Sequence, residues 1–133
     1  MKIKSDTYVF SINDALINII EKELSHLSSS QSDYYILNFR DPDYSAERGG
    51  FHPVEIMLNE KGVIQYITDF AYVGQGGMAE LVKEIDFEFS SGICEHFGRC
   101  YPIEQCKELF DVWQQNFCAY YDMGVFQVTA SSE

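Results

Sequence analysis

Basic residues are scarce in this chain. Nine Lys and Arg stand against 21 Asp and Glu, which gives a formal net charge of -12 at pH 7. A nucleic-acid backbone and an anionic membrane both attract basic surfaces, so we expect neither as a partner. A basic protein surface suits this charge, although a large net charge also serves solubility alone. The imbalance is greater in residues 67–133, with 11 acidic and 3 basic residues, than in residues 1–66, with 10 and 6.

Long apolar runs are also absent. No stretch approaches the 18 or so apolar residues of a membrane-spanning helix. The first ten residues lack the long apolar segment and the small-residue cleavage site of a signal peptide. We therefore expect a cytoplasmic protein whose four cysteines are reduced thiols.

The paired cysteines of structural zinc sites are missing as well. Cys94, His96, Cys100 and Cys106 are near one another in the sequence, but their spacing contains no CxxC pair. Cys106 also falls on the apolar stripe of a predicted helix, where a thiol behaves as a small hydrophobic group. The sequence therefore predicts no metal site and no cofactor.

Material for a core is plentiful. Hydrophobic residues make up 46% of the chain and aromatic residues 15%. A length of 133 residues is typical of one domain, and no internal repeat or linker-like stretch divides it. We expect residues 1–133 to form a single domain.

Two segments repeat apolar residues at helical spacing. The first covers residues 13–27, with Ser11 or Asn13 as its cap. The second starts at Pro102, a residue suited to the first position of a helix, and ends before Gly124. The apolar stripes are Leu16, Ile19, Ile20, Leu24 and Leu27 in the first, and Ile103, Cys106, Phe110, Trp113, Phe117 and Tyr120 in the second.

Short segments rich in aromatic and β-branched residues predict the strands. Most of the gaps between them are too short for a helical crossover, which favours antiparallel pairing. We therefore predict an α+β fold: a strongly twisted antiparallel sheet of about seven strands flanked by two main helices. Residues 79–83 are expected to form one helical turn and residues 130–133 a frayed tail. The predicted strands are residues 7–10, 34–39, 53–59, 63–73, 85–89, 93–97 and 125–129, and residues 28–32 form a polar connection.

The hairpin around residues 90–92 has two plausible registers. A two-residue loop sets Glu88 opposite Glu95, which is unfavourable because like charges then face each other. A three-residue loop pairs Phe89 with Ile93 and aligns the apolar faces, but it turns Glu95 inward. A shift of one residue reverses every side chain, and the sequence leaves this choice open.

The long turn-rich loop over residues 40–52 is the most suggestive stretch for binding. Loops of this length without periodicity are uncommon and are often functional. The ordinary alternative is a surface loop held by its own hydrogen bonds, with Asp41 and Asp43 in Asx turns. Its candidate binding residues are Arg40, Asp41, Asp43, Tyr44, Arg48 and His52.

His52 and Asp69 are a candidate acid–base pair, because a carboxylate beside an imidazole supports proton transfer. Arg40 or Arg48 would then hold an anion. No nucleophile motif and no phosphate-binding glycine loop accompany them. The sequence therefore assigns no catalytic residue and favours a protein that is not an enzyme.

Alternation over residues 84–89 places three carboxylates, Glu84, Asp86 and Glu88, on one face of a predicted strand. A solvated face is the ordinary reading of such a row. The sharper hypothesis is a docking strip for a basic partner.

The chain contains six distinctive runs: Asn38 to Ala46, Gly50 to Ile56, Tyr66 to Gly74, Leu81 to Phe87, Trp113 to Phe117 and Met123 to Val128. In their order along the chain, these runs resemble a bacterial family, domain of unknown function 2787. The resemblance implies a twisted antiparallel sheet with flanking helices, an architecture similar to that of an acidic, complement-binding family of the mitochondrial matrix. That family binds many partners and forms ring-shaped trimers. The resemblance also implies a marine or enteric gammaproteobacterial source, and it brings no catalytic residues.

The leading functional hypothesis is an acidic, non-enzymatic interaction module that binds a basic protein surface. One alternative is a small-molecule-binding protein or enzyme that uses the loop from Arg40 to His52. A second alternative is a DNA mimic. The oligomeric state, monomer or small homo-oligomer, is left open by the sequence.

Overall fold

The computed structural model describes residues 2–5, 8–27, 32–74 and 76–133. Seven strands form one antiparallel sheet in the order β6-β5-β4-β3-β2-β1-β7, which confirms the predicted α+β class. The strands are β1 (Tyr34–Arg40), β2 (Val54–Asn59), β3 (Ile64–Val73), β4 (Glu80–Glu88), β5 (Ile93–His96), β6 (Arg99–Pro102) and β7 (Gln127–Ser132). The helices are α1 (Asp14–Leu24) and α2 (Lys107–Asp122), with short 3-10 helices at Gly76–Met78 and Ile103–Cys106.

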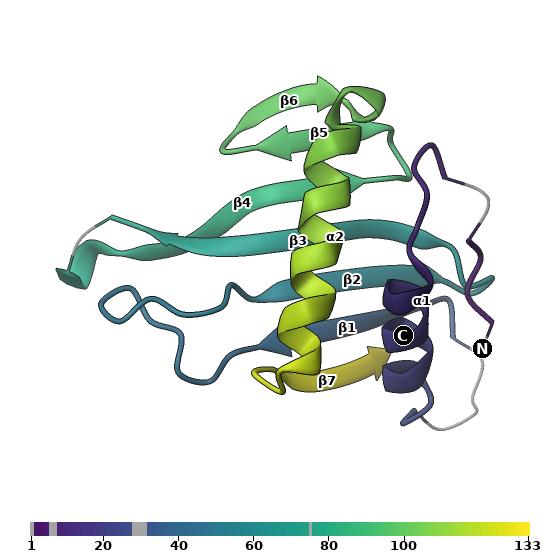
Figure 1. Ribbon diagram of the computed structural model, residues 1–133, viewed down its shortest axis with the longest axis horizontal. Helices are drawn as coiled ribbons and strands as arrows, with labels where there is room; N and C mark the ends of the chain where they lie inside the picture. Colours follow the sequence, from purple (N-terminus) through teal and green to yellow (C-terminus); the bar gives the residue numbers. More distant parts are fainter. Residues whose placement is uncertain (1, 6–7, 28–31, 75) are drawn as a thin grey trace.

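Both α-helices lie on the same face of the sheet, and α2 runs across the strands (Figure 1). The predicted apolar stripe of α2 supplies its buried side, where Phe110, Trp113 and Phe117 face the sheet. Phe110 meets Phe87 of β4 edge-to-face at 5.0 Å, and Phe117 meets Phe39 of β1 at 4.9 Å. Burial of these rings fixes α2 over the centre of the sheet.

The helix α1 packs beside α2 near β1 and β7. Asn13 occupies the N-cap position, but its side chain makes no capping hydrogen bond. Its backbone N–H instead donates to Oε1 of Gln114, at 3.0 Å, and Nε2 of Gln114 donates to the carbonyl of Ser11, at 3.1 Å. A buried side chain of α2 therefore anchors the backbone that leads into α1, whereas the side-chain cap predicted for Ser11 or Asn13 is not formed at the N-cap position. Within the described residues, no helix combines the length and the apolar character that crossing a bilayer requires.

One predicted strand is not formed, and one observed strand was not predicted. Residues 8–10 form bends rather than a strand, and Thr7 lies outside the described residues. The seventh strand is β6, which the sequence did not predict, and Pro102 is its last residue rather than the first of a helix. Proline is tolerated there because β6 is an edge strand of the sheet. Of the predicted polar connection over residues 28–32, only Ser32 is described.

The helical turn predicted at residues 79–83 is wrong, because residues 80–83 form the first part of β4. Their partners are the outer residues of β3: Val73 lies opposite Glu80, and Phe70 lies opposite Lys83. The frayed tail is also wrong. Ala130 to Ser132 belong to β7 and pair with Leu37 to Tyr35, because β1 would otherwise leave one edge of its backbone unpaired.

Neither predicted register of the hairpin at residues 90–92 is observed. Glu88 lies opposite Ile93 and Asp86 opposite Glu95, so the loop contains four residues. Phe89 has left the strand, and its ring packs against Tyr8, Phe10 and Phe110 at centroid distances of 5.2–6.0 Å. Packing of the Phe89 ring outweighs the pairing of Phe89 with β5. In the resulting register, the side chain of Cys94 points into the core and that of Glu95 points outward.

Candidate functional site

The loop from Arg40 to His52 is organised by Asp41. One carboxylate oxygen of Asp41 accepts a hydrogen bond from the backbone of Asp43, at 2.9 Å, and the other accepts from the backbone of Phe51, at 3.0 Å. Such Asx-type bonds fold a loop back on itself. The second bond spans the loop and brings Phe51 and His52 to the start of β2.

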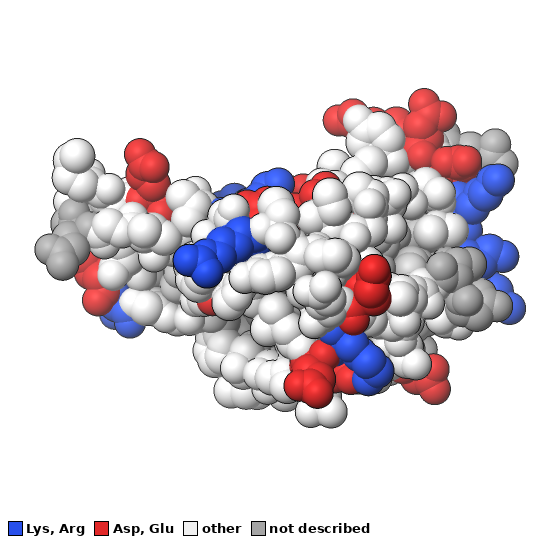
Figure 2. Space-filling view, turned by 90° about the horizontal axis from the view of Figure 1, so that it is seen from above, with Lys and Arg blue, Asp and Glu red and all other residues white. Residues whose placement is uncertain are grey.

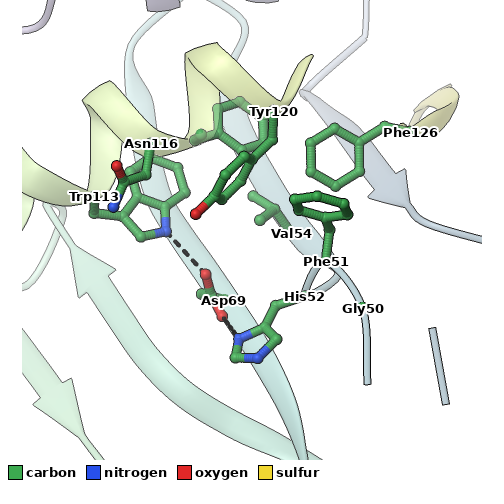
Figure 3. Close-up of a pocket in the computed structure, with 10 residues that line it drawn as sticks. Gly50, Phe51, His52, Val54, Asp69, Trp113, Asn116, Tyr120 and Phe126 are labelled. Atoms are coloured by element: carbon green, nitrogen blue, oxygen red, sulfur yellow. Dashed lines mark hydrogen bonds and ion pairs between the residues drawn. The ribbon is translucent and has the colours of Figure 1, made fainter. Parts of the chain in front are cut away.

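His52 meets two carboxylates there. Its Nδ1 lies 2.9 Å from Oδ1 of Asp69 on β3 and 2.8 Å from Oε2 of Glu84 on β4. Asp69 is held from the other side, because Nε1 of Trp113 donates to its Oδ2 at 2.9 Å (Figure 3). With Asp69 as acceptor, the Nδ1 of His52 carries the proton, so Nε2 is the nitrogen available for proton exchange.

An irregularity in the sheet brings Glu84 to this point. Strands β3 and β4 pair in register up to Asp69 and Ile85, and the next pair is Phe70 with Lys83, which leaves Glu84 as an extra residue. Such a β-bulge sets two residues opposite one and re-aims a side chain. Glu84 therefore reaches His52 and Asp69 on the helical face, although simple alternation would have placed it with Asp86 on the opposite face.

A pocket of about 290 Å³ opens beside the pair of His52 and Asp69, between α2 and the end of the loop (Figure 3). Its walls are largely aromatic, since α2 contributes Trp113, Phe117 and Tyr120. Apolar walls with a few convergent polar groups are typical of small-molecule sites. The remaining lining residues are Gly50, Phe51, Val54, Asn116 and Phe126.

The surroundings of His52 change its proton affinity. The hydrogen bond to Asp69 raises the pKa of His52 above its ordinary value, burial lowers it in part, and the charges of Asp69 and Glu84 raise it further. A group whose pKa is raised on folding stabilises the folded protein while it is protonated. This contribution is fully present below the pKa of His52 in the unfolded chain, and it is lost as the pH rises through the pKa in the folded protein.

We therefore expect the stability of the metal-free protein to fall more steeply above neutral pH than that of the variant His52→Gln. The variant keeps every other titrating group, so the difference between the two proteins isolates His52. Urea denaturation between pH 5.5 and 9 gives both curves. This range extends from roughly one unit below to two and a half units above the ordinary histidine pKa of about 6.5. A chelator in the buffer removes divalent ions, which could bind His52. Parallel curves would show that the bond between His52 and Asp69 does not favour the protonated ring.

The other predicted loop residues lie outside the pocket lining. The ring of Tyr44 is near, 5.4 Å from that of His52, and its hydroxyl accepts a hydrogen bond from the backbone of Tyr72, at 2.9 Å. Arg40 is exposed at the end of β1, opposite Gln127. Asp43 and Arg48 are also exposed. The structure thus brings His52, Asp69 and Tyr44 together but leaves both arginines apart from them.

The carboxylate row predicted on β4 is not a continuous strip. Asp86 is only 1% exposed; it accepts a hydrogen bond from Oγ1 of Thr68 at 2.7 Å, and Nζ of Lys83 lies 3.4 Å away. Glu84 is turned to the other face by the bulge. Glu88 remains partly exposed, beside Tyr66 in a separate, smaller hollow of about 170 Å³. Seen from the β6 edge, acidic side chains form separate groups, several of them beside basic side chains (Figure 2).

In the part of the chain that the structure describes, the thiols of Cys94 and Cys106 are neighbours, but the candidate set of Cys94, His96, Cys100 and Cys106 is not close enough to share an ion. Cys94, Cys106 and Cys118 are buried free thiols, and Cys100 is exposed. Burial raises the pKa of both Cys94 and Cys118, the latter to about 11, which suits unreactive core thiols. Among the described residues, the group of His, Cys, Asp and Glu close enough to share an ion is instead His52, Asp69 and Glu84.

Sequence reasoning missed two contributors to the site. Glu84 was assigned to the wrong face, although one signal was present: Val82 and Ile85 are apolar residues three apart, and this breaks the two-residue period of a strand. Trp113 was interpreted as core. It does stack on Phe117 at 5.0 Å, but its indole N–H also holds Asp69. No local pattern in the sequence marks that second contact.

The architecture of this protein is an antiparallel sheet with two helices on one face. A pocket lies between α2 and the loop from Arg40 to His52. The chain belongs to a family of proteins of unknown function, DUF2787, whose model matches residues 14–131. This result confirms the family that the sequence resembled. Among proteins with curated descriptions, none matches the chain.

Two solved structures from Vibrio cholerae are similar to this protein. A hypothetical protein of the pathogenicity island VSP-II has 34% sequence identity and a TM-score of 0.88, over 99% of this chain and 100% of its own. A conserved hypothetical protein of the island VPI-2 has 34% identity and a TM-score of 0.76, over 95% and 98%. The second is described as sharing structural homology with the human P32 protein.

Proposed function

We propose that this protein binds a small molecule in the pocket beside His52 and Asp69. The observation that carries the proposal is the hydrogen-bonded series from Trp113 through Asp69 to His52, which ends at the wall of an aromatic pocket. Polar groups held in this way keep a fixed orientation before a ligand arrives, which reduces the entropic cost of binding.

The lining indicates the class of ligand. The rings of Phe51, Tyr120 and Phe126 offer flat apolar contacts, whereas His52 and Asn116 offer hydrogen bonds. A volume of about 290 Å³ is at the lower end for ligand pockets. These properties fit a compact, planar ligand with one hydrogen-bonding group.

Proton transfer is a second candidate function, and the bond between His52 and Asp69 favours it. A carboxylate on Nδ1 fixes the tautomer of the ring, so that Nε2 takes up or releases a proton. The residues that line the pocket include no Ser, Cys or Lys. A reaction here would therefore use His52 as an acid or base and would not involve a hydroxyl, thiol or amine nucleophile from Ser, Cys or Lys of the lining.

Narrowing the pocket tests the binding proposal. Asn116 is an exposed residue of α2 that lines the pocket, so Asn116→Phe should fill it without disturbing the core. Its neighbour Gln115 is also exposed and lies outside the lining, which makes Gln115→Phe the matched control. A library of planar heteroaromatic fragments, followed by ligand-observed NMR, supplies the probes.

Fragments that bind the wild type should bind Gln115→Phe equally and Asn116→Phe at least about tenfold more weakly, a loss of roughly 1.4 kcal/mol. Equal binding to both variants would place the fragments elsewhere. A library without any saturable binder at about 1 mM, which corresponds to roughly -4 kcal/mol, would contradict the proposal outright.

The acidic interaction module stays a prediction. The burial of Asp86 and the displacement of Glu84 remove the strip on which it depended, while the net charge of -12 still favours basic partners. Capture of partners from the native host at low and high salt tests it, because binding steered by charge weakens as salt rises. The DNA-mimic alternative would require competition with duplex DNA for a DNA-binding enzyme.

A further inference from the structure

We propose that His52, Asp69 and Glu84 together bind a divalent metal ion beside the pocket. Three ligand atoms, Nδ1 of His52 and one carboxylate oxygen from each acidic residue, lie within 4.8 Å of one another. The inference extends the proposed function without depending on it, because these side chains form the site whether or not an organic ligand binds.

The spacing of the three atoms fits a six-coordinate ion. Nδ1 lies 2.9 Å from the Asp69 oxygen and 2.8 Å from the Glu84 oxygen. An octahedral ion with ligand bonds of about 2.1 Å sets neighbouring ligand atoms roughly 3 Å apart. The histidine nitrogen can thus occupy a position next to each of the two carboxylate oxygens around one ion.

Without an ion, the arrangement leaves a polar atom unsatisfied. Nδ1 carries one proton, which it directs to Asp69. Oε2 of Glu84 is buried and lies 2.8 Å from the same nitrogen, and no other group of the described residues donates to it, so one of the two carboxylate oxygens is always left without the proton. Buried carboxylate oxygens without a partner are costly. A cation that replaces the Nδ1 proton would contact all three atoms at once.

The surroundings hold the ligands in place. Trp113 donates to Oδ2 of Asp69 and leaves Oδ1 for the ion, which is how outer residues commonly orient a metal-binding carboxylate. The bulge in β4 commits Glu84 to this side of the sheet. His52 and Asp69 also line the pocket, so the remaining coordination positions would face it and accept water or the ligand.

The donor set indicates the class of ion. One imidazole nitrogen and two carboxylate oxygens suit Mn²⁺, Fe²⁺, Co²⁺ or Zn²⁺, whereas soft copper(I) prefers thiolates and thioethers. Mn²⁺ is the best probe because the exposed thiol of Cys100 competes poorly for it. Trp113 is the only tryptophan of the chain and bonds directly to Asp69, so its fluorescence reports on an ion at this site.

The test is a titration of the full, untagged chain with Mn²⁺, followed by the paramagnetic resonance signal of free Mn²⁺ and by quenching of Trp113. The wild type should bind one ion, and both signals should saturate together. Glu84→Gln removes one charged ligand and should weaken binding at least about tenfold. Glu88→Gln removes the same charge from the same strand outside the cluster, and its affinity should equal that of the wild type.

Absence of saturable quenching in the wild type, or unchanged affinity in Glu84→Gln, would overturn the site. If both glutamate variants lose affinity equally, the ion responds to general charge only, and the proposal also fails. Circular dichroism and thermal melting confirm that the variants fold. If Glu84→Gln does not fold, Glu84→Asp keeps the charge and withdraws the carboxylate by one methylene, and it should weaken Mn²⁺ binding in the same way.

Discussion

Replacement of Phe110 by alanine is expected to lower the free energy of unfolding by about 4 kcal/mol, as for other large-to-small changes at buried aromatic residues. Phe110 is fully buried on α2. Its ring stacks on Phe10 at 5.1 Å and meets Phe87 and Phe89 edge-to-face at 5.0 and 5.6 Å. Removal of the ring would leave a cavity where α2, β4 and the N-terminal segment meet.

Urea denaturation, followed by far-UV circular dichroism, gives this value. The control is Val112→Ala, two residues away on the same helix. Val112 is 57% exposed, so its loss should stay within about 0.5 kcal/mol. A loss below about 1 kcal/mol for Phe110→Ala would mean that the aromatic cluster does not hold α2 on the sheet, because cavity formation alone costs more than that.

Replacement of Gln114 by leucine is the second large effect, with an expected loss of about 3 kcal/mol. Gln114 is 1% exposed, and its side chain accepts from the backbone of Asn13 and donates to the carbonyl of Ser11. Leucine fills a similar volume but makes neither bond. Two backbone groups at the start of α1 would then lack partners, at roughly 1–3 kcal/mol each.

Hydrogen exchange separates this effect from general destabilisation. In Gln114→Leu the amide of Asn13 should exchange at least about tenfold faster relative to the amides in the centre of β3, because the region nearest the lost bond opens first. Gln115→Leu, on the exposed neighbour, should change neither stability nor exchange. Uniform acceleration at both places would show that α1 does not depend locally on Gln114.

The sequence predicts those parts of the fold that repeat a local pattern. The apolar stripe of α2 and the alternation in β2 and β3 follow directly from residue spacing. Phe89 shows where local patterns fail: it continues the alternation of β4, yet its ring packs against Phe10 and Phe110 instead of continuing the strand. The prediction that Pro102 begins a helix is wrong for a related reason. That β6 is an edge strand, where proline is tolerated, is evident only from the complete sheet.

The candidate site was predictable in part. His52 and Asp69 could be paired from the sequence because His52 directly precedes one predicted strand and Asp69 lies on the next, and a short turn joins the two strands. Glu84 and the indole of Trp113 could not, since their positions depend on a bulge and on the placement of α2 across the sheet. Arg40 and Arg48 were reasonable candidates by composition alone, but the internal bonds of Asp41 determine which loop residues turn inward.

The bulge at Glu84 has a genetic consequence. Because it is one extra residue in a strand, deletion of a single codon would let Lys83 and Ile85 become adjacent and β4 pair with β3 without interruption. Such a deletion would remove one of the two carboxylates beside His52 while it left the ladder intact. Within the family, then, the cluster of His52, Asp69 and Glu84 could be gained or lost in one mutational event without a change of fold. Family members with and without the extra residue would allow the same comparison of metal binding as the Glu84 variants.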